Sequence, residues 1–169
     1  KGEIRSQYHH ISDIAPTIME AVGIERPDEY HGIKQQPFTG ISMNYSFDNA
    51  SAPNAKKRQY YEMFGNRAIW EDGWKAVTLH ANRMPWDVNL VADFDDDVWE
   101  LYHVAEDFSE STDLAKQYPE KLEELKKVFE EEAWANQVYP MYDDMLARLN
   151  AVNYVIFGDK KEFTYYSPG

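Results

Sequence analysis

The segment that decides the fold is VWELYHVAEDFSESTDLA, residues Val98 to Ala115. Over Val98 to Val104, successive side chains alternate between two unlike sets, which is the two-residue period of a β-strand. From Glu106 to Asp113, acidic and hydroxyl side chains replace this pattern, and such side chains bond their own backbone in turns and caps. The segment therefore predicts a strand that ends in an acidic turn and leads toward a helix.

The residues after this turn predict the clearest helix of the chain. Pro119 suits a first helical turn, because the amide that proline lacks would be unpaired there. From Pro119 to about Gln137, charged side chains surround a single apolar stripe. The stripe consists of Leu122, Leu125, Phe129 and Ala133. One stripe means one packed face, and we expect that face to lie on a sheet.

Two earlier stretches supply strands for this sheet. Aromatic and β-branched residues are dense from Gln59 to Phe64 and from Ala68 to Leu79, and Gly73 stands where a tight hairpin turn needs a glycine. We predict antiparallel strands over about Gln59 to Phe64 and Trp74 to Leu79, with Ala68 to Trp70 continuing the first. The basic cluster Lys56-Lys57-Arg58 before them is interpreted as a solvated turn.

The N-terminal part predicts one helix followed by a long connection. Apolar residues recur at helical spacing from Ile14 to Val22, with Ser12-Asp13 as a cap before them and Gly23 as a left-handed end. Residues 25–53 contain three prolines and no sustained periodicity, which indicates a surface connection. Such a long connection usually belongs to a larger body.

Together these patterns predict an α+β fold. We expect a small antiparallel sheet of about three to four strands packed against the long C-terminal helix, plus an N-terminal helix that belongs to the end of a larger α/β core. The expected division is residues 1–53, the end of the core region with its connection, and residues 54–169, a C-terminal α+β subdomain. Beyond it, apolar residues from Met145 to Val152 suggest a short second helix, and an aromatic tail to Tyr166 is expected to pack on this body or on a missing part.

Composition and charge exclude several classes of partner. The 169 residues are 43% hydrophobic, enough for a buried core, and the formal charge of -13 argues against nucleic acid and anionic membranes, which are bound through Lys and Arg. No apolar run approaches the roughly 18 residues of a membrane helix, so we expect a soluble chain of unknown compartment, cytoplasmic or periplasmic in a bacterium. With no cysteine, the chain has no disulfide, zinc-thiolate site or cysteine nucleophile.

The acidic run before the decisive strand invites a calcium-loop interpretation. Asp93, Asp95 and Asp97 have the 1-3-5 spacing of an EF-hand loop, but such a loop needs Gly at its sixth position and Glu at its twelfth. Val98 and Val104 stand there. We therefore interpret the run as a solvated acidic turn. The five histidines likewise form no metal-ligand spacing with a second His or a carboxylate on a helix.

Three motifs in this order resemble the C-terminal part of the sulfatase family, within the alkaline phosphatase superfamily. They are HHISDIAPTIMEAVGI at His9 to Ile24, YEMFGNRAIWEDGWKAV at Tyr61 to Val77, and WELYHVAEDFSESTDLA at Trp99 to Ala115. The first is similar to the family's Asp-x-x-Pro-Thr helix, the second to its Gly-Asn-Arg-Ala hairpin, and the third to its Leu-Tyr-x-Leu and Leu-Ala series. The arrangement most resembles the bacterial arylsulfatase branch.

The resemblance implies a parent enzyme that hydrolyses sulfate esters of small molecules or glycans. In that family a Cys or Ser within Cys/Ser-x-Pro-x-Arg becomes formylglycine, and Asp and Asn side chains hold a calcium ion. No Cys/Ser-x-Pro-x-Arg occurs in this chain. The resemblance therefore implies that both groups belong to a missing N-terminal core domain, the partner of this chain, and we expect the chain alone to contain no catalytic or metal-ligating residue and to be inactive.

A C-terminal subdomain of this kind can still line the substrate cleft, which gives four residues a secondary role. They are Arg67, Asn66, His9 and His10. Arg67 is the most informative, because a guanidinium binds an anionic ester bidentately, although it can equally pair with a carboxylate of this acidic chain. His9 and His10 point to opposite sides of an extended backbone, so at most one of them faces a given site.

Two other functions fit the same residues. A phosphonate or phosphate ester hydrolase of the same superfamily would share this C-terminal architecture and differ in the metal-site residues. A non-enzymatic, acidic interaction module would instead bind a partner through its aromatic tail.

Overall fold

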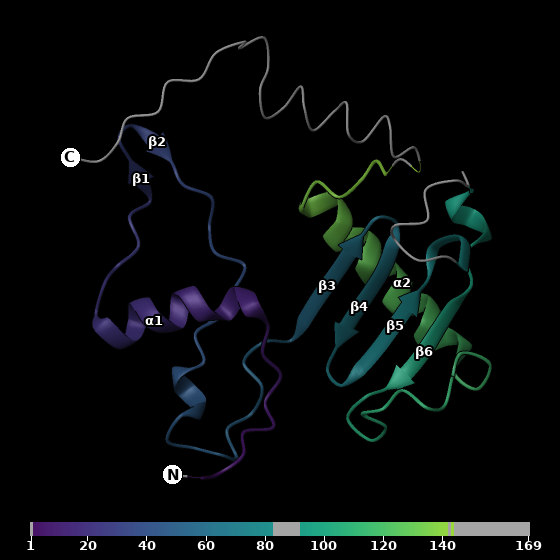
Figure 1. Ribbon diagram of the computed structural model, residues 1–169, viewed down its shortest axis with the longest axis horizontal. Coiled ribbons are helices and arrows are strands. Elements are labelled where there is room, and N and C mark those ends of the chain that lie inside the picture. The colour runs from purple at the N-terminus through teal and green to yellow at the C-terminus, as the bar shows by residue number, and fades with distance from the viewer. Residues whose placement is uncertain (1, 83–91, 142, 144–169) are drawn as a thin grey trace. The chain divides into compact units, whose positions relative to one another are not determined.

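The computed structural model describes residues 2–82, 92–141 and 143 and has an α+β fold (Figure 1). Its internal contacts divide the chain into two compact units, Lys1–Gln59 and Tyr60–Gly169, and each unit is described by itself. No helix among the described residues has the length and apolar character needed to cross a membrane. The predicted helix over Met145 to Val152 and the aromatic tail lie outside the described residues.

The first unit contains the predicted helix and a short hairpin that was not predicted. A 3-10 turn, η1 (Ile11–Asp13), leads into α1 (Ile14–Val22), whose bounds agree with the apolar spacing. Gly23 ends the helix with φ of 69°, as expected for a left-handed glycine. The connection that follows carries the two-stranded sheet β1 (Glu29–Tyr30) and β2 (Ile33–Lys34) and a 3-10 turn, η2 (Asn44–Ser46).

Asp13 organises this first unit, although not as the helix cap that was predicted. Its carboxylate makes no capping bond to α1 and instead accepts hydrogen bonds from the backbone amides of His10 (2.8 Å) and Ile41 (2.9 Å). The ammonium of Lys56 lies 2.9 Å from the same carboxylate, and the two side chains are 4% and 1% exposed. The interpretation of Lys56 as part of a solvated turn is therefore wrong. A buried cation needs a buried partner, and Asp13 provides it.

The second unit contains a four-stranded sheet in the order β3-β4-β5-β6. Its strands are β3 (Arg58–Met63), β4 (Asn66–Glu71), β5 (Trp74–Thr78) and β6 (Trp99–His103). The prediction that Ala68 to Trp70 continues the first strand is wrong. The chain turns at Phe64-Gly65, whose φ angles of 53° and 90° fit a two-residue hairpin turn, so these residues form the separate strand β4.

The turn at Gly73 is as predicted and is closely packed. Gly73 has φ of 88°, and a Cβ added there would lie 2.9 Å from the Cβ of Ala105. The amide of Ala105 donates to the carbonyl of Gly73 across a distance of 3.2 Å. Glycine is therefore required both by the backbone conformation and by the close approach of the chain after β6.

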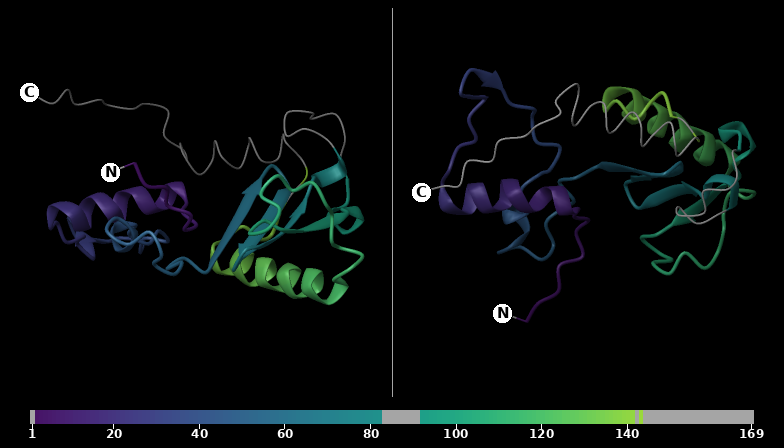
Figure 2. Two further views of the ribbon diagram at one scale, coloured as in Figure 1. Left: turned by 90° about the horizontal axis from the view of Figure 1, so that it is seen from below. Right: turned by 45° about the horizontal axis from the view of Figure 1, so that its top comes forward.

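The core lies between this sheet and α2 (Pro119–Ala135), which runs along one face of the sheet (Figure 2). Ile69, Ala76 and Leu101 stand opposite one another in the strand register and are fully buried. From the helix, Leu125 and Phe129 of the predicted stripe cover this row and are 0% and 1% exposed. The expectation that one helix face packs on the sheet is confirmed.

The acidic turn after β6 bonds the free edge of that strand and so holds the start of α2 beside the sheet. The carboxylate of Asp113 accepts a hydrogen bond from the amide of Leu101 (3.0 Å), and the amide of Leu114 donates to the carbonyl of Leu101 (2.8 Å). Asp107 closes the turn itself by accepting from the amides of Ser111 (2.8 Å) and Thr112 (2.9 Å). The amide and the carbonyl of Leu101, at the edge of the sheet, are thereby hydrogen-bonded, and the start of α2 is held beside β6.

Replacing Phe129 with alanine tests the core. We expect Phe129→Ala to lower the free energy of unfolding by about 3–5 kcal/mol, because it leaves a cavity under α2. Chemical denaturation followed by tryptophan fluorescence measures this loss. Glu130→Ala, at an exposed position of the same helix, should change the free energy by no more than about 0.5 kcal/mol. Equal effects of the two substitutions would contradict the described packing.

Asp13→Asn tests the buried ion pair of the first unit. We expect a loss of about 3–5 kcal/mol of local stability, because Lys56 would remain buried without a counter-charge. Hydrogen exchange of the α1 amides, followed by mass spectrometry, measures this loss. Asp48→Asn, at an exposed position of the same unit, is the matched control and should leave exchange unchanged. Unaltered α1 protection in Asp13→Asn would refute the role of the pair.

The same pair gives this unit a defined acid sensitivity. Burial raises the pKa of Asp13, but the hydrogen bonds from His10, Ile41 and Lys56 outweigh it and hold the pKa below its ordinary value. A carboxyl with a depressed folded-state pKa stabilises the fold at pH values above its unfolded pKa, about 3.9. This stabilisation is lost as the pH falls through the folded-state pKa, so Asp13→Asn should show a weaker loss of protection in acid than the unmodified chain.

Candidate functional site

Arg67 lies near the start of β4, one row beyond the core. In the register it stands opposite Thr78, which in turn stands opposite Trp99, so these residues share the sheet face that α2 covers. The Arg67 side chain is 7% exposed, and its guanidinium carbon lies 5.2 Å from the ring centres of both Phe94 and Trp99. Its charge is thus held between two aromatic rings.

Asp97 is the carboxylate that neutralises Arg67. The two side chains form an ion pair, and the Asp97 side chain is 2% exposed. Of the two alternatives considered for Arg67, pairing with a carboxylate is the one observed. The interpretation of the whole acidic run as solvated is wrong for Asp97, because the 3-10 turn η4 (Phe94–Asp96) ends just before it and its carboxylate lies against the buried guanidinium.

His80 extends this buried network. It belongs to η3 (His80–Asn82), is fully buried, and its Nδ1 lies 2.8 Å from an Asp97 oxygen. Its Nε2 lies 3.2 Å from a carboxylate oxygen of Asp143, whose other oxygen accepts from the amide of Ala92 (2.6 Å). Sequence patterns do not predict this network, since its members are separated by up to 76 positions and share no motif.

The other sequence-derived candidates have local partners. The side-chain oxygen of Asn66 accepts a hydrogen bond from the amide of His80 (2.8 Å), which ties the start of β4 to the end of β5. The ring of His9 lies edge-on to Tyr45, with 6.0 Å between ring centres. His10 caps η1 by accepting from the amide of Ser12 (3.3 Å), and burial together with the nearby Lys56 charge lowers its pKa. His9 and His10 thus belong to the first unit, whereas Asn66 and Arg67 belong to the second.

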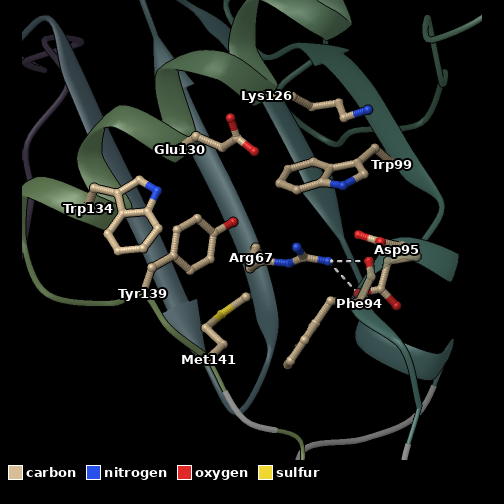
Figure 3. A pocket seen from close by; sticks show the side chains of 10 residues that line it. Arg67, Phe94, Asp95, Trp99, Lys126, Glu130, Trp134, Tyr139 and Met141 are labelled. Atoms are coloured by element: carbon tan, nitrogen blue, oxygen red, sulfur yellow. Dashed lines mark hydrogen bonds and ion pairs between the residues drawn. The ribbon is translucent and has the colours of Figure 1, made fainter.

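A pocket of about 480 Å³ opens beside Arg67 (Figure 3). Its aromatic lining consists of Phe94, Trp99, Trp134 and Tyr139. Its charged lining consists of Arg67, Asp95, Asp97, Lys126 and Glu130, and Met141 completes it. Lys126, Glu130 and Trp134 follow one another at intervals of four along α2, so they form one helix face beside the core stripe. The helical spacing of apolar residues predicts that this face is solvent-exposed and does not indicate that it borders a pocket.

The described residues do not form a site for the calcium ion or the formylglycine that the resemblance implies. Within the described ranges 2–82, 92–141 and 143, no group of three His, Cys, Asp or Glu side chains is arranged to hold a metal ion. The sequence also lacks the Cys/Ser-x-Pro-x-Arg motif that yields formylglycine.

The amino-acid sequence is similar to a curated sulfatase. The chain is 26% identical over 131 residues to arylsulfatase K of Xenopus laevis, an alignment that covers 75% of this chain. The chain spans about a fifth of that relative, since the alignment covers 22% of its length. No family model matches the chain.

Solved structures share the fold. The crystal structure of Ps i-CgsB superposes with a TM-score of 0.51 and 20% identity, covering 85% of this chain and 28% of that protein. The structure of BT4656 in complex with its substrate D-glucosamine-2-N,6-O-disulfate superposes with a TM-score of 0.50 and 19% identity, covering 79% of this chain and 25% of that protein. The resemblance of this chain to the C-terminal part of a sulfatase, inferred from three motifs, is confirmed by these comparisons.

Proposed function

We propose that this chain is the C-terminal part of an enzyme that hydrolyses sulfate esters, and that it completes the fold and lines the substrate cleft without supplying the catalytic centre. The similarity to arylsulfatase K carries this proposal, because it extends over three quarters of the chain. The catalytic centre, with its formylglycine and calcium ion, would lie in the N-terminal core of the parent protein.

The first unit supports a missing partner. Ile14, Ile18 and Val22, which make the apolar face of α1, are 47%, 56% and 60% exposed. Ile11 and Ile24, on either side of the helix, are 77% and 60% exposed. A contiguous apolar surface of this kind marks an interaction site, and the N-terminal core domain is its proposed occupant.

The second unit supports a role at the cleft. Arg67 is held at the wall of a pocket by Asp97, and Asn66 fixes the neighbouring backbone through His80. We propose that this end of the sheet borders the substrate of the parent protein. Because Asp97 already neutralises Arg67, this arginine would orient a polar substrate and not supply an unpaired charge.

Turnover by the parent protein tests the proposed function. The full-length parent should release sulfate from 4-methylumbelliferyl sulfate, whereas this 169-residue chain alone should release none, because its sequence lacks the formylglycine motif and its described residues form no metal site. Fluorescence of the released umbelliferone measures both rates. The matched comparison is 4-methylumbelliferyl phosphate under the same conditions. Turnover by the isolated chain, or a parent that hydrolyses only the phosphate ester, would contradict the proposal.

A further inference from the structure

We propose that the pocket between α2 and the sheet row of Arg67 and Trp99 binds a small organic cation of the alkylammonium class. This inference does not rest on the proposed function, because it follows from the side chains that line the pocket. The pocket volume, about 480 Å³, lies within the range of roughly 300–1,000 Å³ that is typical of small-molecule sites. The pocket is therefore large enough for a small molecule, and the charges and rings of its lining select the class.

The cationic side chains of the pocket are already neutralised. The guanidinium of Arg67 forms an ion pair with Asp97, and both side chains are more than nine-tenths buried. The ammonium of Lys126 lies 2.7 Å from a carboxylate oxygen of Glu123, three positions earlier on α2. An anion that entered the pocket would have to compete with a carboxylate for either cation.

Two carboxylates of the lining have no counter-charge. Glu130 on α2 and Asp95 in η4 are exposed, and neither side chain makes a hydrogen bond or an ion pair within the described part of the chain. The formal charge of -13 over the whole chain adds to the same negative potential. The electrostatic field at the pocket therefore attracts a cation and repels an anion.

The aromatic rings of the pocket suit an organic cation in particular. Trp134 is 65% exposed, and its ring lies 5.5 Å from that of Tyr139 at an angle of 70°. Figure 3 shows these two rings on one side of the pocket and Trp99 on another. The face of an aromatic ring attracts a cation, and tryptophan does so most strongly. The guanidinium of Arg67, 5.2 Å from the ring centre of Trp99, makes this kind of contact at the same pocket.

The same lining does not suit a metal ion. A hard metal cation needs several oxygen ligands close together, and no such group of three acidic, histidine or cysteine side chains occurs among the residues that the structure describes. An alkylammonium ion needs an aromatic surface for its methyl groups and a carboxylate near its charge. Trp134 and Glu130 are four positions apart on α2 and so lie on one helix face, which provides both.

Calorimetric titration of the full-length parent tests this site. The probe is choline, and the control is 3,3-dimethylbutan-1-ol, which has the shape of choline without its charge. We expect saturable binding of choline that weakens as sodium chloride is raised from about 20 to about 200 mM, because salt screens exposed carboxylates. Binding of the uncharged alcohol as tight as that of choline, or no saturable binding of choline, would overturn the proposal.

Matched variants locate the binding. Trp134→Ala should weaken choline binding at least about fivefold. Glu130→Gln keeps the shape of the side chain and should weaken it severalfold, which keeps the test valid if Trp134→Ala fails to fold. Phe108→Ala removes a 93% exposed aromatic side chain outside the pocket, and Glu120→Gln removes a negative charge elsewhere on α2, so neither should change the affinity. Equal affinities in the parent and all four variants would place any bound choline elsewhere and refute the site.

Cation binding and sulfate release are measured separately, so the two proposals fail in different ways. Choline binding that depends on Trp134 and Glu130 in a parent without sulfatase activity would support the site and refute the proposed function. Sulfatase activity in a parent that does not bind choline would refute the site alone.

Discussion

The contact on which the second unit depends is the burial of Ile69, Ala76 and Leu101 beneath Phe129. These three residues form one row across the sheet, and the helix stripe closes over them. Because the row is fully buried, α2 is held over the middle of the strands. The next row, which contains Arg67 and Trp99, therefore lies where the helix covers the sheet only in part. The pocket lies beside this next row, of which Arg67 and Trp99 form part of the lining.

Buried ion pairs fix the polar parts of both units. Asp13 with Lys56 and Asp97 with Arg67 each join segments that are far apart in the sequence, and each pair is almost fully buried. Such pairs stabilise little relative to apolar packing, but removing one partner is costly, so they specify a particular arrangement. In the second unit this arrangement holds a cation between Phe94 and Trp99 at the pocket wall. The polar network and the pocket are thus parts of one structure.

The local patterns of the sequence predicted the periodic elements well. Helix α1, helix α2, strand β6 and the turn at Gly73 all follow from side-chain spacing and turn chemistry, which act over a few residues. The burial of Lys56 and Asp97 could not be predicted in this way, because each depends on a partner 43 or 30 positions away. The division of the first predicted strand into β3 and β4 was missed because the Phe64-Gly65 turn contains an aromatic residue. The pocket was missed because Lys126, Glu130 and Trp134 look like an ordinary solvated helix face.

The central proposal is that this chain completes an enzyme whose reactive group lies elsewhere in the parent protein. Mass spectrometry of proteolytic peptides from the purified parent tests this claim most directly, because formylglycine differs in mass from the Cys or Ser that it replaces. We expect one peptide outside these 169 residues to contain Cys/Ser-x-Pro-x-Arg with its first residue converted to formylglycine. A parent protein that contains no such motif, or contains it only unconverted when purified from its native source, would contradict the claim.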